Sequence, residues 1–260
     1  MRRLLTFFAV AVLTMSAAAA NAGVILEQEI LINGQMAGAN SKRTVMIEGH
    51  KQKVTTSRNS VITDLDRGLV IVLVPARKIY VEMPFPPTEP SGKTMQDAEV
   101  KASYKKTDKQ KTLNGYKCDE YVGSGRMMMA DFTVTGCFSK DAPGAADYTA
   151  YDKALEAKLN GTSTATPGSR PEGVPMVIER ATRIRLASIP DLTPEQAKAM
   201  ADQPPHMTNT RTTSVKSATL PADTFTVPAG YTKSEPRKGR PPGAPMGTPG
   251  KPGAVPKAKE

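Results

Sequence analysis

The sequence predicts a mainly β protein, a meandering antiparallel sheet with few helices. Short β-rich segments with apolar residues at every second position recur along the chain, and turn residues separate them. This spacing is typical of antiparallel strands, whereas alternating β-α units would place helical segments between the strands. About 210 residues lie between two unusual ends, which is enough for one domain with a sizeable core.

The N-terminus has the three parts of a secretory signal peptide. Arg2 and Arg3 give a positive start, residues 4–13 are apolar, and residues 20–22 form a small-x-small cleavage site. The alternative is a membrane anchor, but a helix that crosses a bilayer needs roughly 20 apolar residues. We therefore predict a periplasmic protein whose signal peptide, residues 1–22, is removed after Ala22.

The expected domain, residues 23–232, is followed by a tail, residues 233–260, whose seven prolines and five glycines predict disorder. The tail carries a net charge of +5 and the signal peptide +2, which leaves only +3 of the chain's +10 for the domain. A nucleic-acid-binding domain would carry its positive charge on the folded part, often among stacking aromatics. Trp is absent and aromatics make up 5% of the chain, so we predict no nucleic-acid partner.

The first expected strand, residues 24–32, places Val24, Leu26, Ile30 and Ile32 on one face and ends at Asn33-Gly34, a strong hairpin-turn dipeptide. Further strands are expected within residues 42–49, 51–58, 60–68, 69–83, 99–106, 115–123, 126–138, 174–188 and 211–220.

The segment LVIVLVPARKIYVEM, residues 69–83, is unusual because its first six residues are all apolar. A tight turn at residues 75–78 would make a hairpin in which opposed residues share a face. One face then carries only apolar side chains, those of Val70, Val72, Val74, Ile79, Val81 and Met83. The other face carries Leu69, Ile71 and Leu73 beside Lys78, Tyr80 and Glu82.

Two covers for the second apolar face of this hairpin remain open. In the first, a helix or the proline-rich loops lie over it. In the second, the sheet curves into a half-barrel whose concave face receives an apolar ligand, as pockets do form in the mouths of β-barrels.

Two short helices are expected, both packed on the sheet. Thr193 is a good N-cap, Pro194 suits the first helical position and Gln196 completes a capping box. The second helix spans residues 149–161 and ends at Gly161.

The two cysteines, Cys118 and Cys137, either remain free thiols or form one disulfide, which the export signal favours. Closing a loop of roughly 20 residues would stabilise the fold by about 3 kcal/mol. They lack the Cys-x-x-Cys spacing of a catalytic dithiol.

No catalytic or metal-binding motif stands out, and we expect no enzyme activity, metal or cofactor. His50 and His206 lie apart from any cluster with metal-ligand spacing, and the chain has no G-x-S-x-G elbow. Asp64 and Asp66 suit turn chemistry better than a calcium cage. Residues 127–129, three consecutive methionines, are interpreted as core filler because neighbouring strand residues point to opposite faces.

Three segments resemble one family, namely TLNGYKCDEY (112–121), GVPMVIER (173–180) and SVKSATLPADTFTVPAGY (214–231). They are similar to an uncharacterised family of bacterial envelope proteins related to the periplasmic lipoprotein carriers, the LolA/LolB-like superfamily. The resemblance covers roughly residues 24–232. It implies a mainly β fold, a curved antiparallel half-barrel with a few short helices closing its concave side, and in the carriers this cavity holds acyl chains. The chain departs from the carriers in its length and its basic tail.

We therefore predict an exported, non-enzymatic protein that binds an apolar ligand, such as an acyl chain or a lipidated protein, in a half-barrel cavity. The six apolar residues of the 69–83 hairpin are the expected lining. The alternative is a structural or interaction protein of the envelope with a filled barrel and a working tail. The tail is either a spacer or a segment that contacts anionic membrane surfaces.

Overall fold

The structure is a computed structural model, and it describes residues 23–36, 38, 41–86, 101–127, 130–160, 170–186, 189 and 192–235. The predicted signal peptide and the tail from residue 236 onward lie outside the described residues, as do Met128, Met129 and the side chain of Met127.

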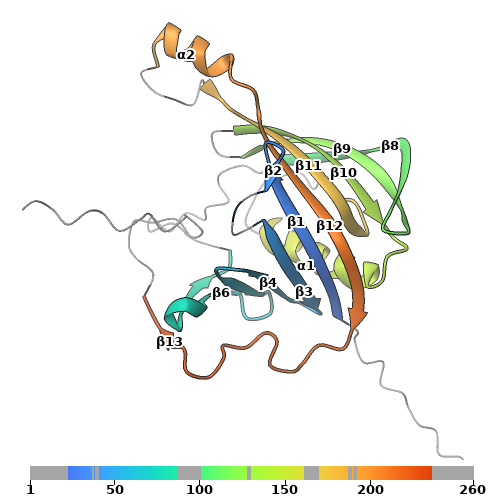
Figure 1. The fold of residues 1–260 in the computed structure, drawn as a ribbon, viewed down its shortest axis with the longest axis vertical. Helices are drawn as coiled ribbons and strands as arrows, with labels where there is room; N and C mark the ends of the chain where they lie inside the picture. The colour runs from blue at the N-terminus through green and yellow to red at the C-terminus, as the bar shows by residue number, and fades with distance from the viewer. Residues whose placement is uncertain are drawn as a thin grey trace, which may run out of the picture.

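The described residues form one large curved antiparallel sheet of 13 strands that does not close into a barrel (Figure 1). The mainly β prediction and the prediction of a curved sheet are confirmed. The strands are β1 (Gly23–Ile32), β2 (Gln35–Met36), β3 (Lys42–Glu48), β4 (Lys51–Thr56), β5 (Ser60–Asp64), β6 (Leu69–Val74), β7 (Ile79–Pro84), β8 (Lys101–Leu113), β9 (Tyr116–Met127), β10 (Ala130–Ser139), β11 (Val174–Ile184), β12 (His206–Ala218) and β13 (Thr232–Lys233).

The sheet has two arms that meet at β1 and β12, and we call this meeting point the bend. The order of strands is β13-β7-β6-β5-β4-β3-β1-β12-β11-β10-β9-β8, with β2 paired to β1. We call β3–β7 the first arm and β8–β11 the second arm. Neighbouring strands pair antiparallel, except that β13 runs parallel to β7. The first and last long strands of the domain therefore lie side by side at the bend.

Several strand limits differ from the expected ones. β8 runs to Leu113 instead of ending near residue 106. The segment 126–138, expected as one strand, belongs to two strands, because Met127 ends β9 and pairs with Ala130 at the start of β10. The last strand, β13 (Thr232–Lys233), crosses the expected domain boundary at residue 232.

The turns follow the predicted chemistry. Asn33 and Gly34 both adopt positive φ, 48° and 79°, which suits a tight hairpin turn. The hairpin of β6 and β7 has the predicted register, with Val74 opposite Ile79 and Val72 opposite Val81. Its connection is a short 3-10 helix, Pro75–Arg77, which Lys78 ends in the left-handed conformation.

The two α-helices of the described residues behave differently. α1 (Ala145–Asn160) lies within the hollow of the sheet (Figure 1) and contains residues 149–160 of the predicted helix, while its expected end at Gly161 lies outside the described residues. α2 (Pro194–Ala201) has the predicted Thr193 capping box, but none of its residues is buried and it extends beyond the sheet (Figure 1). The expectation that α2 packs on the sheet is wrong, because no apolar side chain of its eight residues reaches the core.

The main core fills the space between α1 and the middle of the sheet. Tyr151 of α1 is 2% exposed and packs with Leu26 and Ile47, which are fully buried. The backbone approaches closely where the helix begins, because a Cβ on Gly144 would lie 2.6 Å from the Cβ of Val24. The core therefore holds α1 against β1 and β3.

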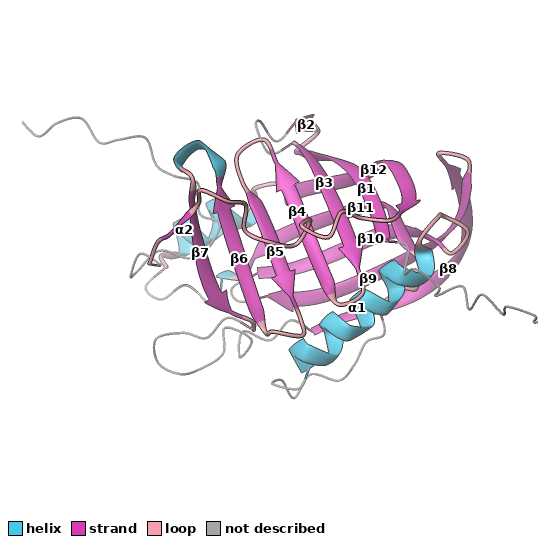
Figure 2. Ribbon diagram, turned by 90° about the horizontal axis from the view of Figure 1, so that it is seen from below, coloured by secondary structure: helices cyan, strands magenta, loops and turns pink. Residues whose placement is uncertain are grey.

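A second, smaller core lies on the outer face of the first arm. The segment after β12 crosses this face from β12 toward β7 (Figure 2), and we call residues 219–231 the outer strap. Its Phe225, Val227 and Tyr231 pack against a buried cluster of Ile62, Ile71 and Leu73. Lys53 Nζ donates a hydrogen bond to the carbonyl of Thr224 at 2.9 Å. One face of β6 is thus covered by the chain's own C-terminal segment.

Candidate functional site

A single row of apolar side chains crosses seven strands on the concave face. Directly opposed residues of neighbouring strands point to the same face. The register sets the members of this apolar row opposite one another in the order Val215, Leu26, Val45, Val54, Val61, Val72 and Val81. The row is therefore continuous from β12 to the end of the first arm.

Burial falls along the apolar row. Leu26 is 0% exposed and Val45 is 5% exposed, because α1 packs over this part of the sheet. Beyond Val54, the valines on β5, β6 and β7 are only half-buried. Apolar side chains of the same kind thus continue along the concave face beyond the fully packed part of the main core, and there they are only half-buried.

The six residues predicted to line a cavity all lie on this concave face. They are half-buried, and their cross-strand pairs match the prediction, as for Val70 opposite Met83. None of them lines the pocket described next, which lies closer to the bend. They extend the same face outward from that pocket through Val61, which is opposite both Val54 and Val72.

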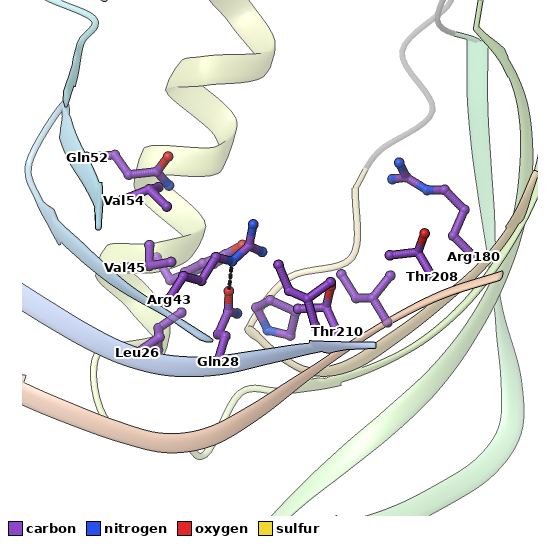
Figure 3. A pocket seen from close by; sticks show the side chains of 13 residues that line it. Leu26, Gln28, Arg43, Val45, Gln52, Val54, Arg180, Thr208 and Thr210 are labelled. Atoms are coloured by element: carbon purple, nitrogen blue, oxygen red, sulfur yellow. Dashed lines mark hydrogen bonds between the residues drawn. The ribbon is translucent and has the colours of Figure 1, made fainter. Parts of the chain in front are cut away.

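The pocket lies in the hollow between the bend of the sheet and α1, and its volume is about 400 Å³ (Figure 3). This volume lies within the range of roughly 300–1,000 Å³ that is typical of ligand sites. The lining contains apolar side chains of the row, Leu26, Val45 and Val54, together with Tyr148 of α1. It also contains two cationic side chains, Arg43 and Arg180.

A chain of hydrogen bonds fixes Arg43. The hydroxyl of Thr212 donates to the carbonyl of Pro175 at 2.6 Å and accepts from Gln28 Nε2 at 3.1 Å. Gln28 Oε1 then accepts from Arg43 Nε at 2.8 Å. Gln28 and Thr212 are buried, at 5% and 4% exposure. The Nε bond to the buried Gln28 thus holds the guanidinium of Arg43 in a defined position above β1.

Arg180 enters the pocket from β11, on the other side of the hollow (Figure 3). Its guanidinium lies over the ring of Phe132, with 5.1 Å between the guanidinium carbon and the ring centroid, a cation–π arrangement. Its Nε is buried and has no hydrogen-bond partner among the described residues. A buried donor without a partner is uncommon in folded proteins.

Burial shifts the titration of groups around the pocket. Burial raises the pKa of the Tyr148 hydroxyl, and the nearby carboxylate of Asp152 adds to that rise. Burial lowers the pKa of Arg43, which remains a cation at neutral pH because an arginine titrates far above it. Asp152 itself is paired with Arg170, Oδ1 to Nη1 at 2.8 Å. The carboxylate that acts on Tyr148 is therefore already engaged in an ion pair.

The pocket residues Gln28, Arg43 and Arg180 were not among those predicted. Gln28 lies between Leu26 and Ile30 on a strand face that is otherwise apolar, and Arg43 precedes Val45 on the same face. A polar residue at a core-facing position of a strand can be recognised from the sequence pattern, and this signal could have identified Gln28 and Arg43 as candidate site residues.

The remaining sequence candidates form no catalytic arrangement. His50 Nδ1 lies 2.7 Å from Asp66 Oδ1, but both side chains are exposed in turns outside the pocket. Asp64 accepts a hydrogen bond from the backbone N–H of Arg67 at 3.0 Å, the predicted turn role. His206 is exposed at the start of β12. Within the described ranges, no group of three or more His, Cys, Asp or Glu residues is arranged to hold a metal.

Cys118 and Cys137 form the predicted disulfide, which joins neighbouring strands β9 and β10 with 5.4 Å between the Cα atoms. Both residues are buried in the main core. Disulfides persist mainly in oxidising compartments, so the bond fits a protein that leaves the cytosol.

No family model matches this chain, and no curated protein matches it either. Among the helices of the described residues, none is both long and apolar enough to span a membrane.

Proposed function

We propose that this protein is an exported, non-enzymatic binding protein of the periplasm that holds an apolar ligand, such as an acyl chain or a lipidated partner, in the hollow of its sheet. The observation that carries this proposal is the apolar row, which continues from the pocket onto half-buried valines of the first arm. An unfilled apolar face next to a pocket is a typical binding surface.

The two faces of the first arm support the proposal. The outer face is covered by the outer strap, whose Phe225 packs on Ile71 and Leu73. On the concave face, Val54 still packs against the main core that contains α1, whereas Val61, Val72 and Val81 belong to neither core of the described residues. A ligand that covers them gains about 25 cal/mol for each Å² of apolar surface removed from water.

The resemblance to the periplasmic lipoprotein carriers supports the same proposal, because their half-barrels hold acyl chains. The disulfide supports the periplasmic location.

The test uses a neutral apolar dye, N-phenyl-1-naphthylamine, whose fluorescence rises in an apolar site. The chain has no Trp, so emission from indole does not interfere. We expect the wild-type protein to bind the dye and Val72→Glu to lose binding, since a carboxylate in the hollow would have to be desolvated. Val122→Glu is the matched control, because Val122 is 40% exposed on β9 and lies outside the pocket.

Thermal unfolding followed by circular dichroism checks that both variants are folded. If Val72→Glu unfolds, Val72→Ser replaces it, and a weaker dye affinity is again expected. Dye binding by a folded Val72→Glu variant at the wild-type affinity contradicts the proposed lining.

A further inference from the structure

The charged side chains that line the pocket are all positive. Arg43 and Arg180 line it, whereas no Asp or Glu does. Among the described residues, neither guanidinium lies within ion-pair distance of a carboxylate. The Asp152 carboxylate, which lies near Tyr148, is held by Arg170. The pocket therefore contains positive charge that the described part of the chain does not neutralise.

Such an arrangement is costly for a protein unless an anion compensates it. Buried charges are normally paired, because an uncompensated charge loses its hydration without gaining a partner. Arg43 is half-buried, and its Nε bond to Gln28 orients the guanidinium without neutralising it. Arg180 has a buried Nε without a partner and is supported by an aromatic ring instead of a carboxylate.

We propose that the ligand is an anionic amphiphile, an acyl chain headed by a carboxylate or phosphate group, whose oxyanion is bound by Arg43 and Arg180. This inference rests on the proposed function and names the chemistry of the ligand's polar end. The planar guanidinium presents paired N–H donors that match the oxygens of carboxylate and phosphate groups.

The pocket has polar contacts for the head group of such a molecule and apolar contacts for its acyl chain. Figure 3 shows the two guanidinium groups rising from opposite sides of the hollow, with Leu26, Val45 and Val54 on its floor and side. From Val54 the apolar row continues through Val61 and Val72 toward the open end of the first arm. The head group lies at the bend of the sheet, and the chain follows the row outward.

The test compares four molecules that share a dodecyl chain and differ in the head group. These are dodecanoate, dodecyl phosphate, dodecanol and dodecyltrimethylammonium. The three charged molecules are used below their micelle concentrations and dodecanol below its solubility limit, each to displace N-phenyl-1-naphthylamine. We expect the two anions to bind at least about tenfold more tightly than the neutral and cationic molecules, the factor that one hydrogen bond to a charged group contributes. Tighter binding of the phosphate would identify a phospholipid-type head group, and tighter binding of the carboxylate a fatty acid.

The variants assign the preference to the two arginines. Arg43→Gln and Arg180→Gln should each reduce the preference for anions, while dodecanol binds as before. Arg43→Lys keeps the charge but loses the fork of donors, so a partial loss is expected. Arg58→Gln is the matched control, because Arg58 is exposed in the turn between β4 and β5 and should leave all four affinities unchanged.

The outcomes separate this inference from the proposed function. Equal affinity of the wild-type protein for all four molecules overturns the anion site and leaves the apolar hollow intact. Binding of none of them overturns both. An anion preference that persists in the Arg43→Gln/Arg180→Gln double variant also overturns the inference, because the charge that attracts the anion then lies elsewhere. If the double variant is unfolded, the comparison of head groups with the wild-type protein and the folded single variants decides.

Discussion

The two halves of the apolar row differ in what covers them. Near the bend, Leu26 and Val45 lie under α1 and are almost fully buried. On the first arm, Val72 and Val81 have the same chemistry and the same orientation, yet they are half-buried. The strand pattern therefore places apolar side chains on the concave face along its whole width. Whether they form core or binding surface depends on how far the helix reaches.

The largest expected difference between the two halves is in stability. Leu26→Ala should destabilise the protein by about 3–5 kcal/mol, because it leaves a cavity in a fully buried site. Val72→Ala should cost less than about 1 kcal/mol, since Val72 is half-buried and fewer packing contacts are lost. Urea unfolding of both variants measures the comparison. Equal losses would show that the hollow is packed equally across its width.

The disulfide lies in the same main core as Leu26 and Val45 and therefore tests the same comparison. Replacing both Cys118 and Cys137 with Ala should cost about 3 kcal/mol, since the bond closes a loop across a separation of 19 residues. Affinity for N-phenyl-1-naphthylamine should stay unchanged in the folded variant at low temperature. A loss of dye binding without a loss of stability would place the disulfide in the binding site instead of the core.

The outer strap tests whether the two faces of the first arm are independent. Phe225→Ala should cost about 1–2 kcal/mol, less than a fully buried Phe would, because Phe225 is only partly buried over Ile71 and Leu73. Dye binding on the concave face should be unaffected. Thermal unfolding and dye titration of the same sample measure both effects, and a weakened dye affinity would contradict independent faces.

The smallest expected effect concerns an ion pair next to α1. Lys140 and Lys153 donate to the two carboxylate oxygens of Glu172 at 2.8 Å and 2.6 Å and lower its pKa to about 2. Because this pKa is below the usual 4.5, the stabilisation is complete above about pH 4.5 and is lost as the pH falls toward about 2.

Glu172→Gln removes this pH-dependent contribution. Between pH 5 and pH 3, the melting temperature of the wild-type protein should fall more than that of the variant, by less than about 2 °C, since exposed ion pairs contribute little. Differential scanning calorimetry at low salt measures the difference. A larger fall in the variant would contradict the assigned sign.

Much of the first arm could be predicted from the sequence. The all-apolar strand of residues 69–74, the turn at Pro75 and the pairing of Val72 with Val81 follow from local pattern and turn chemistry. The helix cap at Thr193 and the hairpin turn at Asn33 could also be predicted, because each depends on neighbouring residues alone.

Contacts between distant segments were not predictable in this way. The pairing of β1 with β12 joins residues almost 190 positions apart, such as Leu26 and Val215, and no local signal specifies it. The outer strap is not predictable for the same reason, since its side chains pack on residues of β5 and β6 that are far away in the sequence. The hydrogen-bond chain from Thr212 through Gln28 to Arg43 depends on that same long-range pairing.

The most direct test of an open apolar hollow is native mass spectrometry of the full chain, expressed in a bacterial host and purified without detergent. The account predicts a population heavier than the bare chain by the mass of an acyl lipid, which organic extraction releases and which Val72→Glu lacks. A single species at the mass of the bare chain, from protein that also fails to take up dodecanoate, would contradict it.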